Sequence, residues 1–230
     1  MHVAKEYQQS DRKEVYLEPG LVSKYPGFKI AYSLIRDVSN DKTYPEIAKL
    51  IQDLPAYVKA NEQDILLRAD KMKRFYKRLG SKNRYHILSL LKSTLNGREY
   101  QIINPAVDLV YAVELHHGLL MGLHDLEQIQ EDIYVGVAQG VEKLDHIFQG
   151  NITLDPGAIF LKNGKTVMAS VSDGPDKNTK VTEKSRNILV IAFGSPEDSE
   201  AFLMAAMKET SQLFKEYNLG TPENVDIRIA

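Results

Sequence analysis

The sequence predicts an α+β fold, with mixed α and β elements in which β-sheets are covered by helices. Short apolar stretches separated by turn-forming residues occur near the start and throughout the second half of the chain, as in β-sheets. Between them, from Tyr44 to Gly97, apolar residues recur at helical spacings. With 230 residues, 43% of them hydrophobic, the chain can bury a substantial core. We expect residues 14–230 to form a single domain after a flexible N-terminus at residues 1–13.

The first predicted elements are two strands. Glu14 to Leu17 and Phe28 to Val38 are extended, apolar stretches. They are separated by Pro19-Gly20 and Pro26-Gly27, which favour turns because proline fixes φ and glycine accepts conformations that other residues avoid. This arrangement predicts an antiparallel start to the sheet.

The section from Tyr44 to Gly97 is predicted to form two or three helices. Pro45 suits the start of a helix, where its missing N–H needs no partner, whereas Pro55 is expected to break the helix. The apolar residues at helical spacings in this section are Ile65, Leu66, Met72, Phe75 and Leu79.

Asn104-Pro105 predicts the start of a further helix, because asparagine caps a helix well and proline fits its first position. This helix is expected to reach about His117, and Gly118 to Asp125 should follow as an apolar strand with a polar end. The rest of the chain predicts a mixed sheet, and Ser195 to Asp198 should cap a long helix that Gly220 ends. The strands expected here are Ile133–Val137, Ala158–Leu161, Val167–Val171, Asn187–Ala192 and Val225–Ile229.

Composition excludes several classes of function. The formal net charge of −2 argues against a general nucleic-acid coat, and any contact with tRNA must be a local patch. The absence of cysteine excludes disulfides, thiolate catalysis and thiolate metal sites. No run approaches the roughly 20 apolar residues that a membrane span needs. We therefore expect a soluble, cytoplasmic protein that binds neither membrane nor DNA.

Two groups of polar residues could carry chemistry. Asn104, Asp108 and Tyr111 fall on one side of their predicted helix and could line a pocket, although capping and packing explain them equally well. His124 and Asp125 invite a general-base role, but neighbouring residues on a strand point to opposite faces and need not touch.

Other motifs give weaker signals. His116 and His117 are adjacent, which is a poor spacing for a metal, so we expect no metal site. No phosphate-binding loop or nucleophile elbow occurs, and no cofactor is expected. The loop from Gly174 to Lys180 is rich in turn formers and could be either functional or a solvated connection.

Basic residues concentrate between Arg68 and Arg84, where Asp70 is the single acid. Lys71, Arg74 and Arg78 lie on one helical face, with aromatic residues between them, which would suit a tRNA backbone. A solvated helix face would have the same composition.

Five segments, taken in order, give the sequence a resemblance to a known family. They are Pro26–Lys29, Phe75–Leu91, Ile103–Val110, Gly118–Leu126, and Thr179–Glu183 together with Arg186–Leu189. Over about residues 20 to 229 the chain resembles the B3/B4 domain, the tRNA-editing domain of the phenylalanyl-tRNA synthetase beta subunit. The resemblance implies the corresponding fold and a stand-alone trans-editing deacylase, which hydrolyses the ester of a mischarged tRNA without a covalent intermediate. A non-catalytic module that binds tRNA or amino acid is the alternative.

The resemblance also implies a pocket for the aminoacylated 3′ end of tRNA. Here the family's pocket histidine is replaced by Gly122, its helix threonine by Val110, and its glycine-rich loop by Ala169–Gly174. The amino-acid specificity of the synthetase domain is therefore not expected to carry over. We expect His124 or Asp125 to orient water for hydrolysis. The substrate-binding residues expected are Asn104, Asp108, Tyr111, Glu114, Gly122, Ser170, Ser172, Asp173, Thr179 and Glu183. The residues expected to bind tRNA are Lys71, Arg74, Arg78, Lys177 and Lys180.

Overall fold

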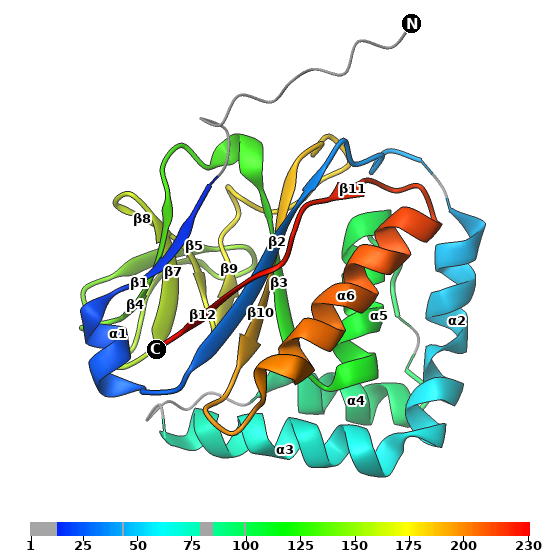
Figure 1. The fold of residues 1–230 in the computed structure, drawn as a ribbon, viewed down its shortest axis with the longest axis horizontal. Coiled ribbons are helices and arrows are strands. Elements are labelled where there is room, and N and C mark those ends of the chain that lie inside the picture. Colours follow the sequence, from blue (N-terminus) through cyan, green and yellow to red (C-terminus); the bar gives the residue numbers. More distant parts are fainter. Residues whose placement is uncertain (1–12, 43, 79–84, 99) are drawn as a thin grey trace, which may run out of the picture.

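The computed structural model has the predicted α+β architecture and describes residues 13–42, 44–78, 85–98 and 100–230. Two β-sheets lie side by side, and helices cover the far face of the second sheet and close one end (Figure 1). No helix in the described part of the chain is long and apolar enough to cross a membrane. The expected flexible N-terminus lies outside the described residues, apart from Lys13.

The first sheet combines one parallel pair with antiparallel pairs. β1 runs parallel to β4, and every other neighbouring pair in this sheet is antiparallel. The strands follow the order β1 (Val15–Leu17), β4 (Ile133–Val137), β7 (Ile159–Asn163), β8 (Thr166–Ser170) and β9 (Gly174–Pro175).

The second sheet is antiparallel and is built around β2 and β10. β10 reads Ile-Leu-Val-Ile-Ala-Phe-Gly and is buried throughout, as expected of a strand covered on both faces. β2 pairs with β10 on one side and with both β11 and β12 on the other. The strands are β11 (Thr221–Pro222), β12 (Asp226–Ile229), β2 (Lys29–Arg36), β10 (Ile188–Gly194) and β3 (Leu120–Asp125).

The remaining elements are a small hairpin and the helices. The hairpin, β5 (Lys143–His146) and β6 (Gly150–Thr153), packs on the first sheet through a cluster that includes Leu144 and Phe160. α5 and α6 pack on the second sheet, α2 lies outside α5, and α3 and α4 run across the end of the molecule (Figure 1). The helices are α1 (Pro19–Lys24), α2 (Pro45–Ala60), α3 (Glu62–Arg78), α4 (His86–Leu95), α5 (Pro105–His117), the short 3₁₀ helix η2 (Leu126–Gln128) and α6 (Glu200–Glu216).

The core has two main parts. One lies between the two sheets and continues beneath α2, α3 and α4; the other lies between the second sheet and the pair α5 and α6. Successive residues of a strand face opposite sides. Leu120 of β3 therefore joins the first part and Met121 the second.

Three expectations about the elements are wrong. β1 and β2 do not form an antiparallel pair, because α1 occupies the expected Pro19-Gly20 turn and carries the chain to the other sheet. Pro55 does not break α2, which continues through it with the proline ring on the exposed side. The cap of α6 is Ser199, whose hydroxyl accepts a hydrogen bond from the Phe202 N–H, so the helix starts just after the predicted cap.

Candidate functional site

The start of α5 is held by the polar residues that the sequence singled out. The Asn104 side chain accepts a hydrogen bond from the Val107 N–H at 3.1 Å, as a helix cap does. Oδ1 of the buried Asp108 accepts hydrogen bonds from the Tyr100 hydroxyl at 3.0 Å and the Ile103 N–H at 2.9 Å. Burial raises the pKa of the Asp108 carboxyl. These two side chains therefore fasten the preceding loop to the helix.

Tyr111, one turn farther along α5, lines a cleft of about 430 Å³ between α2, α4 and α5. Its ring stacks on Tyr100 with centroids 4.0 Å apart and planes 15° apart. Thr94 and Arg98 also line the cleft, whereas the described residues around it include no carboxylate and no histidine. The cleft can therefore hold a ligand, and the ionisable side chains among its lining residues are Arg98, Tyr100 and Tyr111.

Glu114 is buried where α5 meets β3. Its Oε1 accepts a hydrogen bond from the Met121 N–H at 2.8 Å. Burial raises the pKa of Glu114 to about 8, although that hydrogen bond opposes the rise, so the carboxyl is protonated at neutral pH. The rings of Tyr76 and Tyr85 lie close enough for a Glu114 charge to raise their own pKa values further, after the larger effect of burial.

His124 belongs to a chain of hydrogen bonds that joins the two sheets. His124 lies on β3 and faces the space between the sheets, two residues after Gly122 on the same side. Its Nδ1 lies 2.8 Å from Oγ1 of Thr179, and the Thr179 hydroxyl donates to Oδ1 of Asp176. Asp176 in turn is fixed to the first sheet by its N–H, which donates to the Met168 carbonyl at 2.8 Å.

This chain determines the tautomer of His124. Because the Thr179 hydroxyl gives its proton to Asp176, its oxygen must accept from the His124 Nδ1–H, which leaves Nε2 as a bare acceptor. Burial lowers the pKa of His124 to about 4, and the charge of Asp176 only partly opposes this. The imidazole is therefore neutral at physiological pH, with its basic nitrogen directed away from Thr179.

Gly122 leaves room beside that nitrogen. A methyl group at Gly122 would lie 3.9 Å from His124 Nε2, 3.4 Å from Ile191 and 3.6 Å from Phe193, all ordinary contact distances. A methyl group would therefore fit in this space without a close contact. Gly122 is itself partly exposed, whereas His124 is 1% exposed.

Asp125 points to the other side of β3 and makes no hydrogen bond with His124. Its Oδ1 accepts from the Glu127 N–H at 3.0 Å, and its Oδ2 accepts from the Ser185 hydroxyl at 2.6 Å. Its own N–H donates to the Thr179 carbonyl at 2.7 Å. Asp125 thereby caps η2 and holds the segment that carries Thr179.

Ser170, Ser172 and Asp173 form a hydrogen-bonded group where β8 turns into β9. Oδ2 of Asp173 accepts from the Ser170 hydroxyl at 2.6 Å and from the Ser172 hydroxyl at 3.0 Å. The backbone of the same turn is held by two buried side chains. The Tyr76 hydroxyl donates to the Val171 carbonyl at 2.6 Å, and His146 Nε2 lies 2.9 Å from the Asp173 carbonyl.

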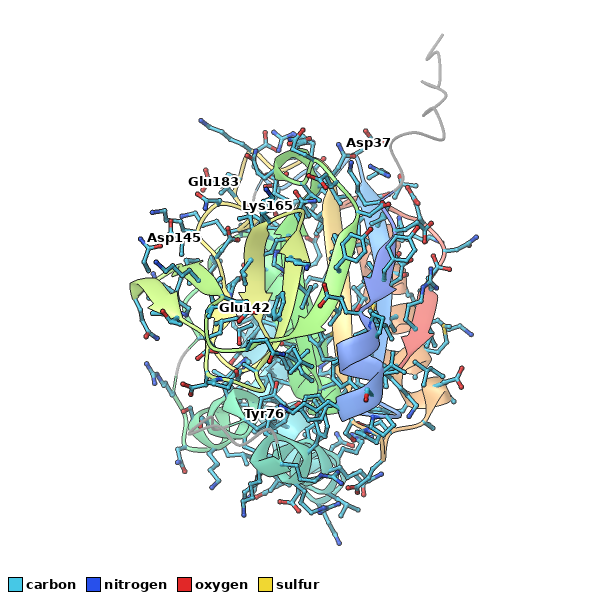
Figure 2. The ribbon with its side chains drawn as sticks, turned by 90° about the vertical axis from the view of Figure 1, so that its left-hand side faces the viewer. Asp37, Tyr76, Glu142, Asp145, Lys165 and Glu183 are labelled. Carbon is cyan, nitrogen blue, oxygen red and sulfur yellow. The ribbon has the colours of Figure 1, made fainter. Side chains whose placement is uncertain are left out.

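The remaining residues expected to bind substrate or tRNA lie at the surface. Glu183 is exposed in the loop before β10, at the upper left of Figure 2, away from the Tyr76 label. Lys177 makes an ion pair with Asp145 at 2.6 Å, and Lys180 is exposed.

The basic residues predicted on one face of α3 lie around Glu197, an acidic residue from the other half of the chain. Arg74 makes ion pairs with Asp70 at 2.6 Å and with Glu197 at 2.9 Å, and Arg78 lies 3.5 Å from Glu197. The hydrogen bond and charge of Arg74, followed by the charges of Arg78 and Lys71, lower the pKa of Glu197 and outweigh the opposing effect of burial. Part of this positive charge is therefore neutralised within the protein.

The structure thus brings Gly122, His124 and Thr179 together and places Ser170, Ser172 and Asp173 at one turn. It places Tyr111 in a separate cleft, and it leaves Glu183 at the surface. The sequence did not single out Asp176, Ser185 or His146, although each carries a bond that fixes these groups. For Asp176 a signal existed: it lies three residues before Thr179 and accepts the Thr179 N–H, as aspartates in turns commonly do.

Comparison with known proteins relates this chain to one family. A family model described as the B3/4 domain matches residues 71–218, well over half of the chain. The phenylalanine–tRNA ligase beta subunit of Idiomarina loihiensis is 32% identical over 96 residues, which cover 41% of this chain and 12% of that protein. An N-terminal fragment of the phenylalanyl-tRNA synthetase beta subunit from Pyrococcus horikoshii shares the fold, with a TM-score of 0.52 and 13% identity, over 92% of this chain and 50% of the fragment. The chain therefore spans only a small part of the curated relative.

Proposed function

Because this chain belongs to the B3/4 domain family, we propose that it is a stand-alone deacylase, which hydrolyses the ester that joins a wrong amino acid to tRNA. The named relatives are subunits of an enzyme that attaches phenylalanine to tRNA, and this supports a role connected with tRNA. The proposal treats residues 14–230 as one domain and places its reaction in the cytoplasm, where tRNAs are charged.

The observation that carries the proposal is the bare Nε2 of His124 beside Gly122. The bond to Thr179 fixes the tautomer, and the glycine leaves room for a water next to the acceptor nitrogen. A general base must lie within hydrogen-bonding reach of the proton that it removes. The proposal places a water within that reach of His124 Nε2, on the side where Gly122 has no side chain.

The proposed reaction needs no covalent intermediate. His124 Nε2 takes a proton from the water as the water oxygen bonds to the ester carbonyl carbon. The bond between that carbon and the ribose oxygen then breaks, and the ribose oxygen receives the proton. The products are a free amino acid and a tRNA with an intact 3′ hydroxyl. A base with a pKa near 4 is weak, but an aminoacyl ester is an activated ester, and correct positioning supplies much of the rate.

The other predicted residues receive supporting roles. Ser170, Ser172 and Asp173 offer hydroxyl and carboxylate groups for a polar substrate side chain. A site that hydrogen-bonds its substrate strongly rejects molecules that lack the matching group. Asp125 acts as a positioning residue, because both of its oxygens already hold the protein together.

One observation favours the alternative, a binding module without catalysis. The cleft at Tyr111 is large enough for a small ligand, and the described residues around it include no carboxylate or histidine. In this alternative the protein would hold an amino acid or the end of a tRNA without breaking the ester.

Release of amino acid from a panel of correctly and incorrectly charged tRNAs distinguishes the two. Selective release from a mischarged tRNA supports the deacylase, and the Gly122→Ala variant should then lose activity at least about tenfold, because its methyl group would fill part of the space to which the proposal assigns the water. Gly20→Ala is the matched control, since a methyl group at Gly20 would contact nothing within 4 Å. Tight binding without release from any tRNA would establish the binding module, and full activity in Gly122→Ala would exclude the proposed water position.

A further inference from the structure

The tip of the β5–β6 hairpin presents a single aromatic side chain to solvent. Phe148 is the middle residue of the three-residue loop and is 87% exposed. Gly150 closes this loop with φ at +69°, a conformation that glycine adopts at little cost. Exposing a whole phenylalanine ring is unfavourable, so a ring presented on an ordered turn suggests a ligand.

His146 fixes the turn that carries Phe148. Its Nδ1 accepts hydrogen bonds from the N–H groups of Phe148 and Gln149, both at 3.1 Å. Nε2 must then carry the proton, and it donates to the Asp173 carbonyl at 2.9 Å. One buried imidazole therefore joins the hairpin tip directly to the turn that contains Ser172 and Asp173.

The backbone brings the tip still closer to that turn. The Lys177 N–H donates to the Asp145 carbonyl at 2.9 Å, and the Ile147 N–H donates to the Pro175 carbonyl at 3.2 Å. His146 and Asp176 form an antiparallel bridge between these bonds. The base of the loop that carries Phe148 is therefore held against Pro175 and Asp176, which closely follow the serine and aspartate group.

We propose that Phe148 is a stacking surface for an unpaired base at the acceptor end of tRNA, an inference that rests on the proposed function. Unpaired bases stack on exposed aromatic rings regardless of sequence, and nearby cations hold the phosphates. Lys180 is exposed on the segment that leads away from β9 and is the cation available for this contact, whereas Lys177, at the base of the hairpin, is paired with Asp145.

The surroundings of the ring favour an RNA base over a protein partner. Val141, the other strongly exposed apolar residue near the hairpin, lies beyond the opposite end of β5. Phe148 therefore stands alone rather than within a continuous apolar patch, which a protein interface would require.

The test uses full-length protein and uncharged tRNA in which 2-aminopurine replaces the 3′-terminal adenine. Stacking quenches the fluorescence of 2-aminopurine, so the experiment reports contact with the ring independently of hydrolysis. Wild-type protein should quench the signal on binding. Phe148→Ala should lose most of the quenching and bind about tenfold more weakly, whereas Phe148→Trp should retain both. Val141→Ala, which shortens a side chain that is 75% exposed beyond the opposite end of β5, is the matched control and should behave as wild type.

Each other result overturns the inference in a different way. Quenching and affinity that are unchanged in Phe148→Ala would exclude the stacking role and leave the deacylase proposal intact. A change in the protein's oligomeric state in Phe148→Ala, with tRNA binding unaffected, would assign the ring to a protein contact. Failure of wild-type protein to bind tRNA would overturn both proposals.

Discussion

Histidines and carboxylates meet at two places in this molecule, and they meet differently. At the end of α5, His116 Nδ1 and His117 Nε2 each lie 2.6 Å from an oxygen of Glu209 on α6. On β3, the Thr179 hydroxyl stands between His124 and Asp176. The first arrangement joins imidazole to carboxylate directly, and the second joins them through an alcohol.

Under the proposed function, this difference separates a structural histidine pair from a histidine that takes part in the reaction. Burial alone would raise the pKa of Glu209, but hydrogen bonds from His116 and His117 outweigh it and lower the pKa to about 2. Both oxygens of that carboxylate are occupied, and the bonds tie α5 to α6. The hydroxyl between His124 and Asp176 instead fixes which nitrogen of His124 is free, while burial keeps the imidazole neutral. That free nitrogen lies beside Gly122, on the side of β3 that faces the other sheet.

The largest expected effect comes from removing the free nitrogen. His124→Gln can still bond to Thr179 but has no imidazole Nε2, so release of amino acid from the mischarged tRNA should fall at least about 100-fold. Thermal unfolding of the variant would show whether the fold survives. Glu209→Gln, on the structural side of the comparison, should retain the wild-type rate. If His124→Gln is folded and as active as wild type, the comparison between the two sites fails.

Glu209→Gln should instead lower the free energy of unfolding. The variant replaces two charge-assisted hydrogen bonds with neutral ones, so urea unfolding at neutral pH should show a loss of roughly 2 kcal/mol. Because the folded pKa of Glu209 lies near 2 and the unfolded value is 4.5, this stability is present above about pH 4.5. It is lost as the pH falls toward 2, and the difference between variant and wild type should shrink over that range. A difference that does not depend on pH would contradict this account.

The smallest effect concerns the intervening hydroxyl. Thr179→Val keeps the shape of the side chain but removes the bonds to both His124 and Asp176, so both tautomers of His124 become available. We expect kcat to fall about tenfold with little change in KM, because positioning of the base is affected more than binding. Thr179→Ser restores the hydroxyl and should recover most of the rate. Equal losses in both variants would indicate that the methyl group, and not the hydroxyl, matters.

Local patterns in the sequence were sufficient to predict most of the helices and strands. β4 was predicted to the residue, and the start of α5 followed from Asn104-Pro105, because these signals act within a few neighbouring residues. Pro55 misled the prediction, since tertiary packing of Ile51 and Leu54 holds α2 together through the proline. Propensity is a weak guide wherever packing opposes it.

The candidate site was harder to predict from the sequence, because the residues that contact one another in it lie far apart along the chain. His124 and Thr179 are 55 residues apart, and the sequence around them does not indicate that Thr179 fixes the tautomer of His124. Glu197 neutralises Arg74 from 123 residues away, so the basic face of α3 looked more strongly charged in the sequence than it is. The resemblance to a family indicated the region in which these residues lie. Their hydrogen bonds are seen only in the three-dimensional structure.

The central position of β2 has a consequence for how the protein is made. β2 ends at residue 36, yet its first partner, β10, begins at residue 188, and its other partners, β11 and β12, begin at residues 221 and 226. The second sheet therefore cannot close until β12 has been synthesised. Such distant pairing slows folding and leaves apolar strands exposed in the meantime.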